Sequence, residues 1–111
     1  MPVPRITKEE LKQRLDASDV KPLIIDVRLK YPYEHSAIRL PGAVRVPPAA
    51  VDAAALPRDR DIVAYDSDPD ELVSSRVAAE LIRRGFRAAA LKGGIADWIG
   101  ASYPVEAREG L

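Results

Sequence analysis

The sequence predicts an α/β fold: a single domain with a central, mostly parallel sheet and helices on both of its faces. Three short apolar runs, at residues 23–27, 62–65 and 88–91, have the pattern of strands buried in a parallel sheet. Segments with helical patterning lie before, between and after these runs. The chain has 111 residues, so we expect one domain over residues 1–111 and no second core.

The first predicted helix begins at Lys8 and runs to about Leu15 or Ala17. Thr7 and Glu10 have the spacing of a capping box, in which the Thr7 hydroxyl accepts a hydrogen bond from the third helical N–H and Glu10 reaches back to the backbone of Thr7. Ile6 and Leu11 stand where a hydrophobic staple would pack. These signals place the helix start at Lys8.

The segment from residue 28 to residue 48 is rich in proline and contains one short apolar stretch, residues 43–46. Proline removes a backbone donor and disfavours helix, so we expect a loop, a short strand and a second loop here. Residues 49–56 are rich in alanine and predict a short helix, which Pro57 ends.

The strand at residues 62–65 leads into a short acidic loop, residues 66–71, and then into the best-patterned helix of the chain, residues 71–84. Gly85 follows as its stop. After the third strand, Gly93 and Gly94 predict a tight turn, and residues 95–100 predict a short last helix. The apolar stripe of the long helix consists of Leu72, Val73, Val77, Ala78, Leu81 and Ile82.

The composition excludes several kinds of chemistry. The chain has no cysteine, which rules out a disulfide, a thiolate nucleophile, a persulfide carrier and a cysteine-ligated zinc site. Hydrophobic residues make up 47% and charged residues 31%, a balance typical of a globular domain. We therefore expect a folded domain whose chemistry, if any, depends on carboxylates, guanidinium groups and hydroxyls.

Charge and hydropathy set expectations for partners and location. The formal net charge is zero, which gives no broad positive field for nucleic acid or for an anionic membrane. The first eight residues contain no apolar signal core, and no window of 18 residues is continuously apolar. We expect a cytoplasmic protein with no nucleic-acid or membrane partner. A protein partner is possible, and the sequence specifies neither its identity nor the oligomeric state.

The acidic loop is the place where chemistry is expected. In parallel sheets ligands bind beyond the carboxyl ends of the strands, and a loop that enters a helix offers unpaired N–H groups and a positive dipole end. Here the loop supplies four carboxylates of its own, which would repel an anionic ligand. We expect the loop's own carboxylates to accept hydrogen bonds from its unpaired N–H groups. Its residues are Asp66, Ser67, Asp68, Pro69, Asp70 and Glu71.

Several segments form a recognisable set when they are taken in their order along the chain. They are Ile25-Asp26-Val27-Arg28, Glu34, Leu40-Pro41-Gly42-Ala43, Val46-Pro47, Ile62-Val63-Ala64-Tyr65, Ser75-Arg76-Val77-Ala78, Leu91-Lys92-Gly93-Gly94, Trp98 and Tyr103-Pro104-Val105. Together they resemble the rhodanese-homology domain family, the rhodanese-like sulfurtransferases. The resemblance covers nearly the whole length and implies the α/β fold described above.

The same resemblance implies a lost activity. Members with sulfurtransferase activity place the nucleophilic cysteine where this chain has Asp66, and a subset has a Cys-x-Cys-Pro-Asn-Glu loop in which both cysteines are aspartate here. A carboxylate cannot attack a sulfane sulfur and then carry it. Many members have a histidine where this chain has Arg39, so His35 does not take that role. We expect a catalytically inactive domain, without a cofactor, that acts as a binding or regulatory module.

An alternative enzyme hypothesis starts from the same loop. A buried strand that ends in Asp-x-Asp resembles the haloacid-dehalogenase phosphatases, in which the first aspartate is the nucleophile, the second is a general acid and magnesium joins them. Asp66 and Asp68 would then carry a metal-assisted phosphate-ester hydrolysis and would be the candidate metal ligands. The spacing lacks the glycine and the glutamate that a calcium loop has at its sixth and twelfth positions.

Structural roles compete with these functional ones. Asp66 is expected to accept hydrogen bonds from the loop's own N–H groups, and Asp70 to cap the following helix. Asp26 and Arg28 either line a pocket, as the resemblance implies for the arginine, or form a structural ion pair. His35 is expected at the surface. Trp98 is expected to pack with Tyr103. Tyr31 and Tyr33 are expected either as exposed contact residues or as a lid over the N–H groups of the acidic loop. The candidate contact surface for a partner is this pair of tyrosines together with the acidic loop.

Overall fold

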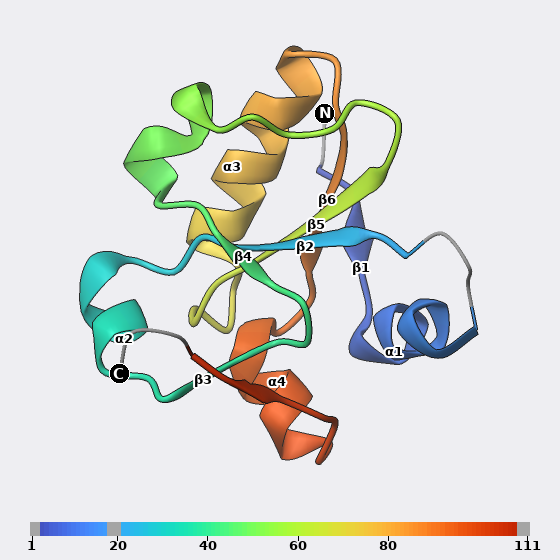
Figure 1. The fold of residues 1–111 in the computed structure, drawn as a ribbon, viewed down its shortest axis with the longest axis vertical. Helices are drawn as coiled ribbons and strands as arrows, with labels where there is room; N and C mark the ends of the chain where they lie inside the picture. Colours follow the sequence, from blue (N-terminus) through green and yellow to red (C-terminus); the bar gives the residue numbers. More distant parts are fainter. Residues whose placement is uncertain (1–2, 18–20, 109–111) are drawn as a thin grey trace.

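The computed structural model describes residues 3–17 and 21–108 and confirms the predicted α/β architecture (Figure 1). Five strands form one fully parallel sheet with the order β1-β6-β5-β2-β4, and β3 and β7 form a separate antiparallel pair. The elements are β1 (Arg5–Ile6), α1 (Lys8–Ala17), β2 (Leu23–Asp26), α2 (Lys30–Glu34), β3 (Ile38–Arg39), β4 (Val44–Arg45), the 3-10 helix η1 (Pro48–Ala53), β5 (Asp61–Tyr65), α3 (Leu72–Arg83), β6 (Arg87–Leu91), α4 (Gly94–Gly100) and β7 (Glu106–Ala107).

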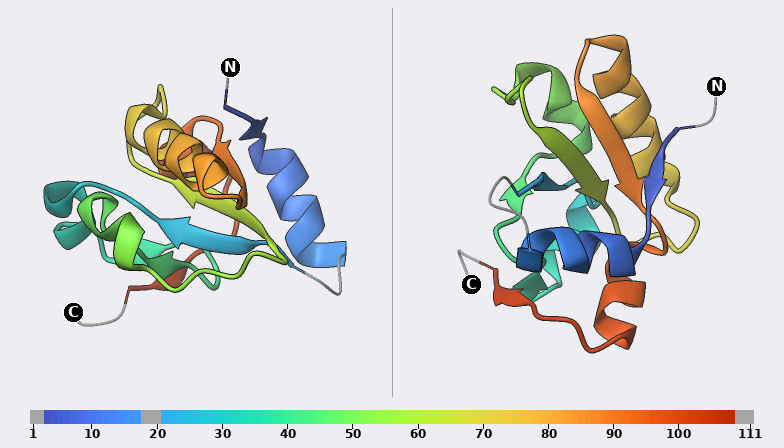
Figure 2. Two further views of the ribbon diagram at one scale, coloured as in Figure 1. Left: turned by 90° about the horizontal axis from the view of Figure 1, so that it is seen from above. Right: turned by 90° about the vertical axis from the view of Figure 1, so that its right-hand side faces the viewer.

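The sheet, whose helices are seen from two sides in Figure 2, separates two hydrophobic clusters of buried side chains. Successive side chains of a strand point to opposite faces, so in β2 Ile25 packs in one cluster and Ile24 in the other. The first cluster includes side chains of α3 and η1, and the second includes side chains of α1 and α4. Helices therefore cover both faces of the sheet, as the sequence predicts.

The capping box at the start of α1 is present, with one difference. The N–H of Glu10 donates to the Thr7 hydroxyl oxygen at 3.1 Å, as predicted. The Glu10 carboxylate, however, accepts from the Thr7 hydroxyl at 3.1 Å rather than from the backbone of Thr7. Ile6 and Leu11 are both buried in the same cluster, as the staple requires.

The proline-rich segment holds more regular structure than predicted. The short strand is present as β4, but the loop before it contains α2, of five residues, and β3, of two. The alanine-rich segment forms the 3-10 helix η1 rather than an α-helix. Elements this short carry too few residues for a periodic signal, so their pairing partners in three dimensions determine them.

The edge strand β1 was also not predicted. It pairs with the last two residues of β6, and the N–H of Ala90 donates to the Pro4 carbonyl at 3.0 Å. Proline has no N–H, so Pro4 cannot return a ladder hydrogen bond, and the pairing does not extend further back. The described helices of α1 to α4 include none that is both long and apolar enough to cross a membrane.

Candidate functional site

The candidate site lies at the carboxyl ends of β2 and β5, which are adjacent in the sheet. Asp26 of β2 pairs in register with Tyr65 of β5, and the N–H of Val27 donates to the Tyr65 carbonyl at 3.0 Å. The segments that follow the two strands therefore start side by side. This brings the Asp26–Arg28 region next to Asp66, the first residue of the acidic loop.

Asp66 is almost completely buried, with 1% of its surface exposed, and its carboxylate binds the loop's own backbone. Oδ1 accepts from the N–H of Asp68 at 3.0 Å, and Oδ2 accepts from the N–H of Ser74 at 2.7 Å. Ser74 is the third residue of α3, so its N–H is one of the groups at a helix start that have no partner within the helix. The carboxylate occupies the N–H groups that an anionic ligand of this loop would need.

Burial has the largest effect on the pKa of the Asp66 carboxyl. Removal from water disfavours the charged form and raises the pKa of the Asp66 carboxyl above its ordinary value of 3.8. The N–H groups of Ser74 and Asp68 stabilise the charged form and lower the pKa, but they offset only part of the effect of burial. Asp66 is thus a buried carboxyl held by backbone dipoles, without a cation among the main causes of its shift.

Asp68 does not join Asp66 in a common ligand set. Its Oδ1 accepts from the N–H of Asp70 at 2.8 Å, and its carbonyl accepts from the N–H of Glu71 at 3.0 Å. Across residues 3–17 and 21–108, no group of three or more His, Cys, Asp or Glu side chains is arranged to hold a metal ion. The loop geometry gives the metal-assisted hydrolase alternative no support.

The start of α3 differs from the prediction, because Asp70 is not its cap. The helix begins at Leu72, and the residue before it, Glu71, has a left-handed backbone with φ of 54°. Glu71 is 1% exposed, and its Oε1 forms an ion pair with Arg5 Nε of β1 at 2.5 Å. The capping role falls to Asp66 from the far end of the loop, since a left-handed residue intervenes between Asp70 and the helix.

Gly94, at the start of α4, is required by its contact with the loop. Its φ is +63°, and a Cβ at this position would lie 2.6 Å from the Asp66 carbonyl oxygen. The next residue, Ile95, donates its N–H to that same carbonyl at 3.0 Å. The predicted glycine turn therefore packs the N-terminus of α4 directly against the backbone of the acidic loop.

Asp26 and Arg28 form the structural ion pair that the sequence allowed. Both side chains are 2% exposed, and Arg28 Nη2 lies 2.7 Å from Asp26 Oδ2 while Nε lies 3.0 Å from Oδ1. Burial would lower the pKa of Arg28, but the hydrogen bonds and the charge of Asp26 outweigh it and leave the pKa raised. Asp26 also contributes to the wall of a cavity of about 270 Å³.

Arg45 is a second guanidinium at this position that the sequence did not single out. Its Nη1 donates to the Arg28 carbonyl at 2.6 Å and to the Asp26 carbonyl at 3.2 Å. The Arg45 guanidinium also lies 4.0 Å from the ring centre of Tyr33. A lone arginine in a short strand predicts only exposure, because the loop carbonyls that hold it are assembled by the fold.

His35 and Trp98 have the structural roles that were expected for them. His35 is exposed, and its Nδ1 lies 3.0 Å from the Tyr31 carbonyl oxygen. Trp98 is fully buried, packs edge-on to Tyr103 at 5.0 Å between ring centres and donates Nε1–H to the Pro104 carbonyl at 2.7 Å. Tyr31 is 71% exposed on α2, which leaves it available as a contact residue.

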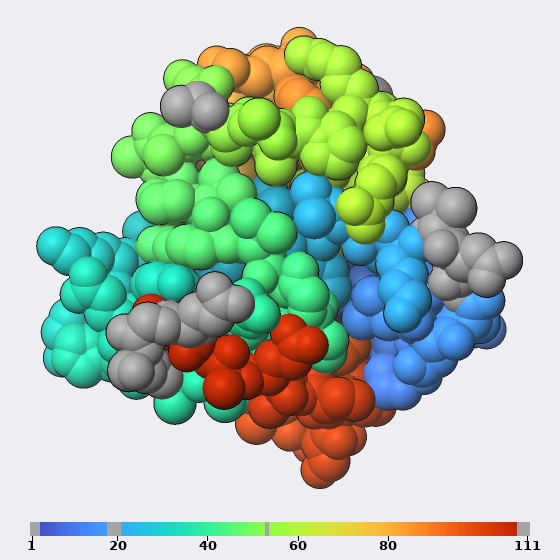
Figure 3. Space-filling model, in the orientation of Figure 1, coloured from blue at the N-terminus to red at the C-terminus, as the bar shows by residue number. Residues whose placement is uncertain are grey.

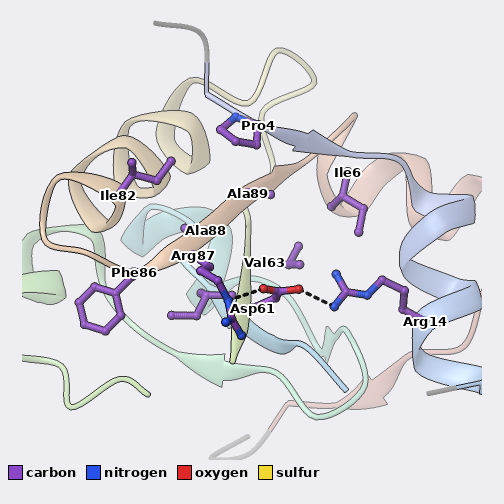
Figure 4. A pocket seen from close by; sticks show the side chains of 11 residues that line it. Pro4, Ile6, Arg14, Asp61, Val63, Ile82, Phe86, Arg87, Ala88 and Ala89 are labelled. Carbon is purple, nitrogen blue, oxygen red and sulfur yellow. Dashed lines mark hydrogen bonds and ion pairs between the residues drawn. The ribbon is translucent and has the colours of Figure 1, made fainter. Parts of the chain in front are cut away.

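A second cavity, of about 350 Å³, lies at the opposite end of the sheet, where β5 and β6 begin (Figure 4). Apolar side chains line most of it, and one carboxylate, Asp61, bridges two arginines across its wall. Asp61 Oδ2 accepts from Arg14 Nη2 at 2.7 Å, and Oδ1 accepts from Arg87 Nε at 2.8 Å. Because this cavity lies away from the acidic loop, we assign it no role in the candidate site.

The bridge at Asp61 predicts a pH dependence of stability. The hydrogen bond from Arg14, followed by that from Arg87, lowers the pKa of Asp61 below its ordinary value of 3.8. The unfolded chain therefore binds the proton more readily, so this stabilisation is present above pH 3.8 and is lost as the pH falls through the folded-state pKa. In thermal unfolding at a series of pH values, Asp61→Asn should be less stable than the wild type at pH 7 and should converge with it in acid. A stability difference that stays constant into acid would contradict this assignment.

A protein-family model matches most of the chain. The family model described as "Rhodanese-like domain" matches residues 7–101. A tRNA sulfurtransferase of Desulfurococcus amylolyticus is 37% identical over 86 residues, which are 78% of this chain and 17% of that protein. An HTH-type transcriptional regulator of Mycobacterium tuberculosis is 35% identical over 114 residues, covering 95% of this chain and 46% of the regulator. The chain thus spans less than half the length of either curated relative.

Solved structures have the same fold as this chain. The solution structure of the rhodanese-like domain of an Anabaena protein is 31% identical, with a TM-score of 0.78, and the match covers 93% of this chain and 78% of that one. A full-length protein from Lactobacillus plantarum has a TM-score of 0.84 at 23% identity, with 94% and 88% of the two chains covered, which is a likeness of fold.

Proposed function

The chain is a member of the rhodanese-like domain family, and from that premise we propose that it is a catalytically inactive rhodanese-like domain that serves as a binding or regulatory module. The observation that carries the proposal is the place of Asp66. Its carboxylate stands where the resemblance puts the sulfur-carrying cysteine, and both of its oxygens accept backbone N–H groups of the loop.

The chemistry of sulfur transfer supports the proposal. The reaction requires a thiolate that attacks a sulfane sulfur and holds it as a persulfide until an acceptor arrives. The chain has no cysteine anywhere in its sequence. A carboxylate oxygen is a poor nucleophile toward sulfur and forms no stable adduct that could serve as a carrier, so the loop cannot be loaded.

Two further points favour binding as the remaining role. The fold is that of the solved relatives although the chain has no cysteine. One relative is named as a transcriptional regulator, a name that describes regulation rather than sulfur transfer. A domain that keeps the family fold without the catalytic cysteine can still present a surface to a partner.

The proposal is tested by a cyanide-dependent sulfur-transfer assay with thiosulfate as donor. We expect the purified wild-type chain to give no turnover above a blank without protein. Asp66→Cys introduces a thiol at the same position, and Asp66→Ser is the matched control of similar size without a thiol. Turnover by the wild-type chain would overturn the proposal. Turnover by Asp66→Cys alone would support the missing nucleophile as the cause of the inactivity.

A further inference from the structure

A third cavity, which we call the basic groove, lies between the start of α2, the segment that joins β4 to η1, and α3. Its volume is about 530 Å³, within the size range of ligand and peptide sites. In Figure 3 the teal atoms around α2 and the green atoms around η1 lie one below the other at the left side of the molecule. The residues that matter in its wall are Leu29, Lys30, Arg45, Pro47, Pro48 and Arg76.

The charge of the basic groove is one-sided, because its wall contains three cationic side chains and no carboxylate. Lys30 and Arg76 are both exposed. Within the described part of the chain, neither forms an ion pair or a side-chain hydrogen bond. Most other cations of this small domain are engaged, as in the pairs that Asp61, Glu71 and Glu80 form with arginines.

Arg45, the third cationic side chain of the basic groove, is held in place by its contacts. Arg45 donates to the Arg28 carbonyl at 2.6 Å and stacks over Tyr33 at 4.0 Å, which fixes its guanidinium. Its nearest carboxylate oxygen, on Asp26, lies 3.8 Å away and belongs to a group already bound by Arg28. A fixed cation loses little conformational freedom on binding, which makes it an effective anchor for an anionic group.

The groove also has an apolar part. Leu29, three residues after the end of β2, is 51% exposed. Pro47 and Pro48 also line the groove and present a rigid apolar surface. A free inorganic anion would pair with the cations but would leave Leu29 and the prolines uncovered, whereas a peptide covers both.

We propose that the basic groove binds an acidic peptide segment of a partner protein, with an apolar side chain of that segment packed on Leu29 and its carboxylates on Lys30, Arg45 and Arg76. This inference rests on the proposed function, since it names the kind of partner that the module would recognise. Charge complementarity selects the partner, and the apolar contact adds the affinity that exposed ion pairs alone do not supply.

The test uses the full chain labelled with nitrogen-15 and an acetylated, amidated peptide with the sequence Glu-Leu-Glu-Leu-Glu, followed by two-dimensional NMR. We expect amide shifts concentrated at Leu29, Lys30, Arg45 and Arg76, weakening as salt is raised. The double variant Lys30→Gln/Arg76→Gln should raise the dissociation constant about tenfold. Lys92→Gln/Arg83→Gln is the matched control, because it removes one exposed lysine and one exposed arginine elsewhere, and it should leave binding unchanged.

Each alternative outcome has a definite meaning. Shifts at the groove with inorganic phosphate that equal those with the peptide would overturn the peptide proposal in favour of a small-anion site. No shifts with the peptide, shifts elsewhere, or equal losses in the two double variants would overturn it as well. The sulfur-transfer assay on the same sample separates the two proposals: turnover contradicts the inactive-domain proposal, whereas a failure of peptide binding without turnover contradicts only the basic groove.

Discussion

Arg28→Met is expected to lower the free energy of unfolding by about 3–5 kcal/mol, the range for breaking a buried ion pair by removal of one partner. The substitution keeps most of the volume but leaves the Asp26 carboxylate buried, with Arg45 at 3.8 Å as its remaining cation. It also removes the hydrogen bond from Arg28 Nη2 to the Ile38 carbonyl, which joins the Asp26–Arg28 region to β3. Urea unfolding followed by circular dichroism measures the loss.

Two variants control this experiment. Asp26→Asn/Arg28→Met removes the uncompensated charge, so it should be more stable than Arg28→Met alone. Arg76→Met removes an exposed arginine that has no ion pair in the described structure, and it should change stability by less than about 0.5 kcal/mol. If Arg28→Met were as mild as Arg76→Met, the ion pair would not be structural.

Asp66→Ala is expected to cost about 1–3 kcal/mol, because it leaves two backbone donors without their acceptor. One of them, the N–H of Ser74, belongs to a completely buried residue, so water cannot easily replace the carboxylate. The matched control is Asp70→Ala in the same loop, which removes an exposed carboxylate of the same size and should have little effect. Chemical unfolding of the two variants gives the comparison. Equal losses of stability in the two variants would show that the Asp66 carboxylate stabilises the loop no more than the exposed Asp70 carboxylate does.

The raised pKa of Asp66 also fixes how this carboxyl contributes to stability at different pH values. The folded state binds the proton more readily than the unfolded chain, so between pH 3.8 and the folded-state pKa the folded state holds more protons. The contribution of Asp66 therefore favours folding at the acidic end and declines as the pH rises through that window. This is opposite in sign to the contribution of Asp61, whose pKa is lowered.

The main elements of the fold could be predicted because each carries a local signal. Each of these signals lies within one element and predicts it: the apolar runs of β2 and β5, the apolar stripe of α3, and the Thr7–Glu10 capping box of α1. The strands β1, β3 and β7 have two residues each, and β1 depends on pairing with the distant β6. No local pattern announces such strands, since the partner strand supplies the hydrogen bonds that define them.

The site was predictable in its location and only partly in its geometry. Asp66 at the end of a buried strand predicted a carboxylate that fills its own loop, and its hydrogen bonds take that form. The prediction of Asp70 as the helix cap was wrong, because Glu71 lies between Asp70 and the helix and has a left-handed backbone. The Glu71 side chain forms an ion pair with Arg5. Arg5 and Glu71 are 66 residues apart, so neither local propensity nor spacing relates them.

The central claim, that the Asp66 carboxylate occupies the anion-binding N–H groups of its own loop, is tested most directly by NMR titration of the wild-type chain. We predict that the amide protons of Asp68 and Ser74 shift together with the carboxyl carbon of Asp66, with one shared pKa above 3.8. Amides of Asp68 and Ser74 whose shifts do not follow the titration of the Asp66 carboxyl would contradict the claim.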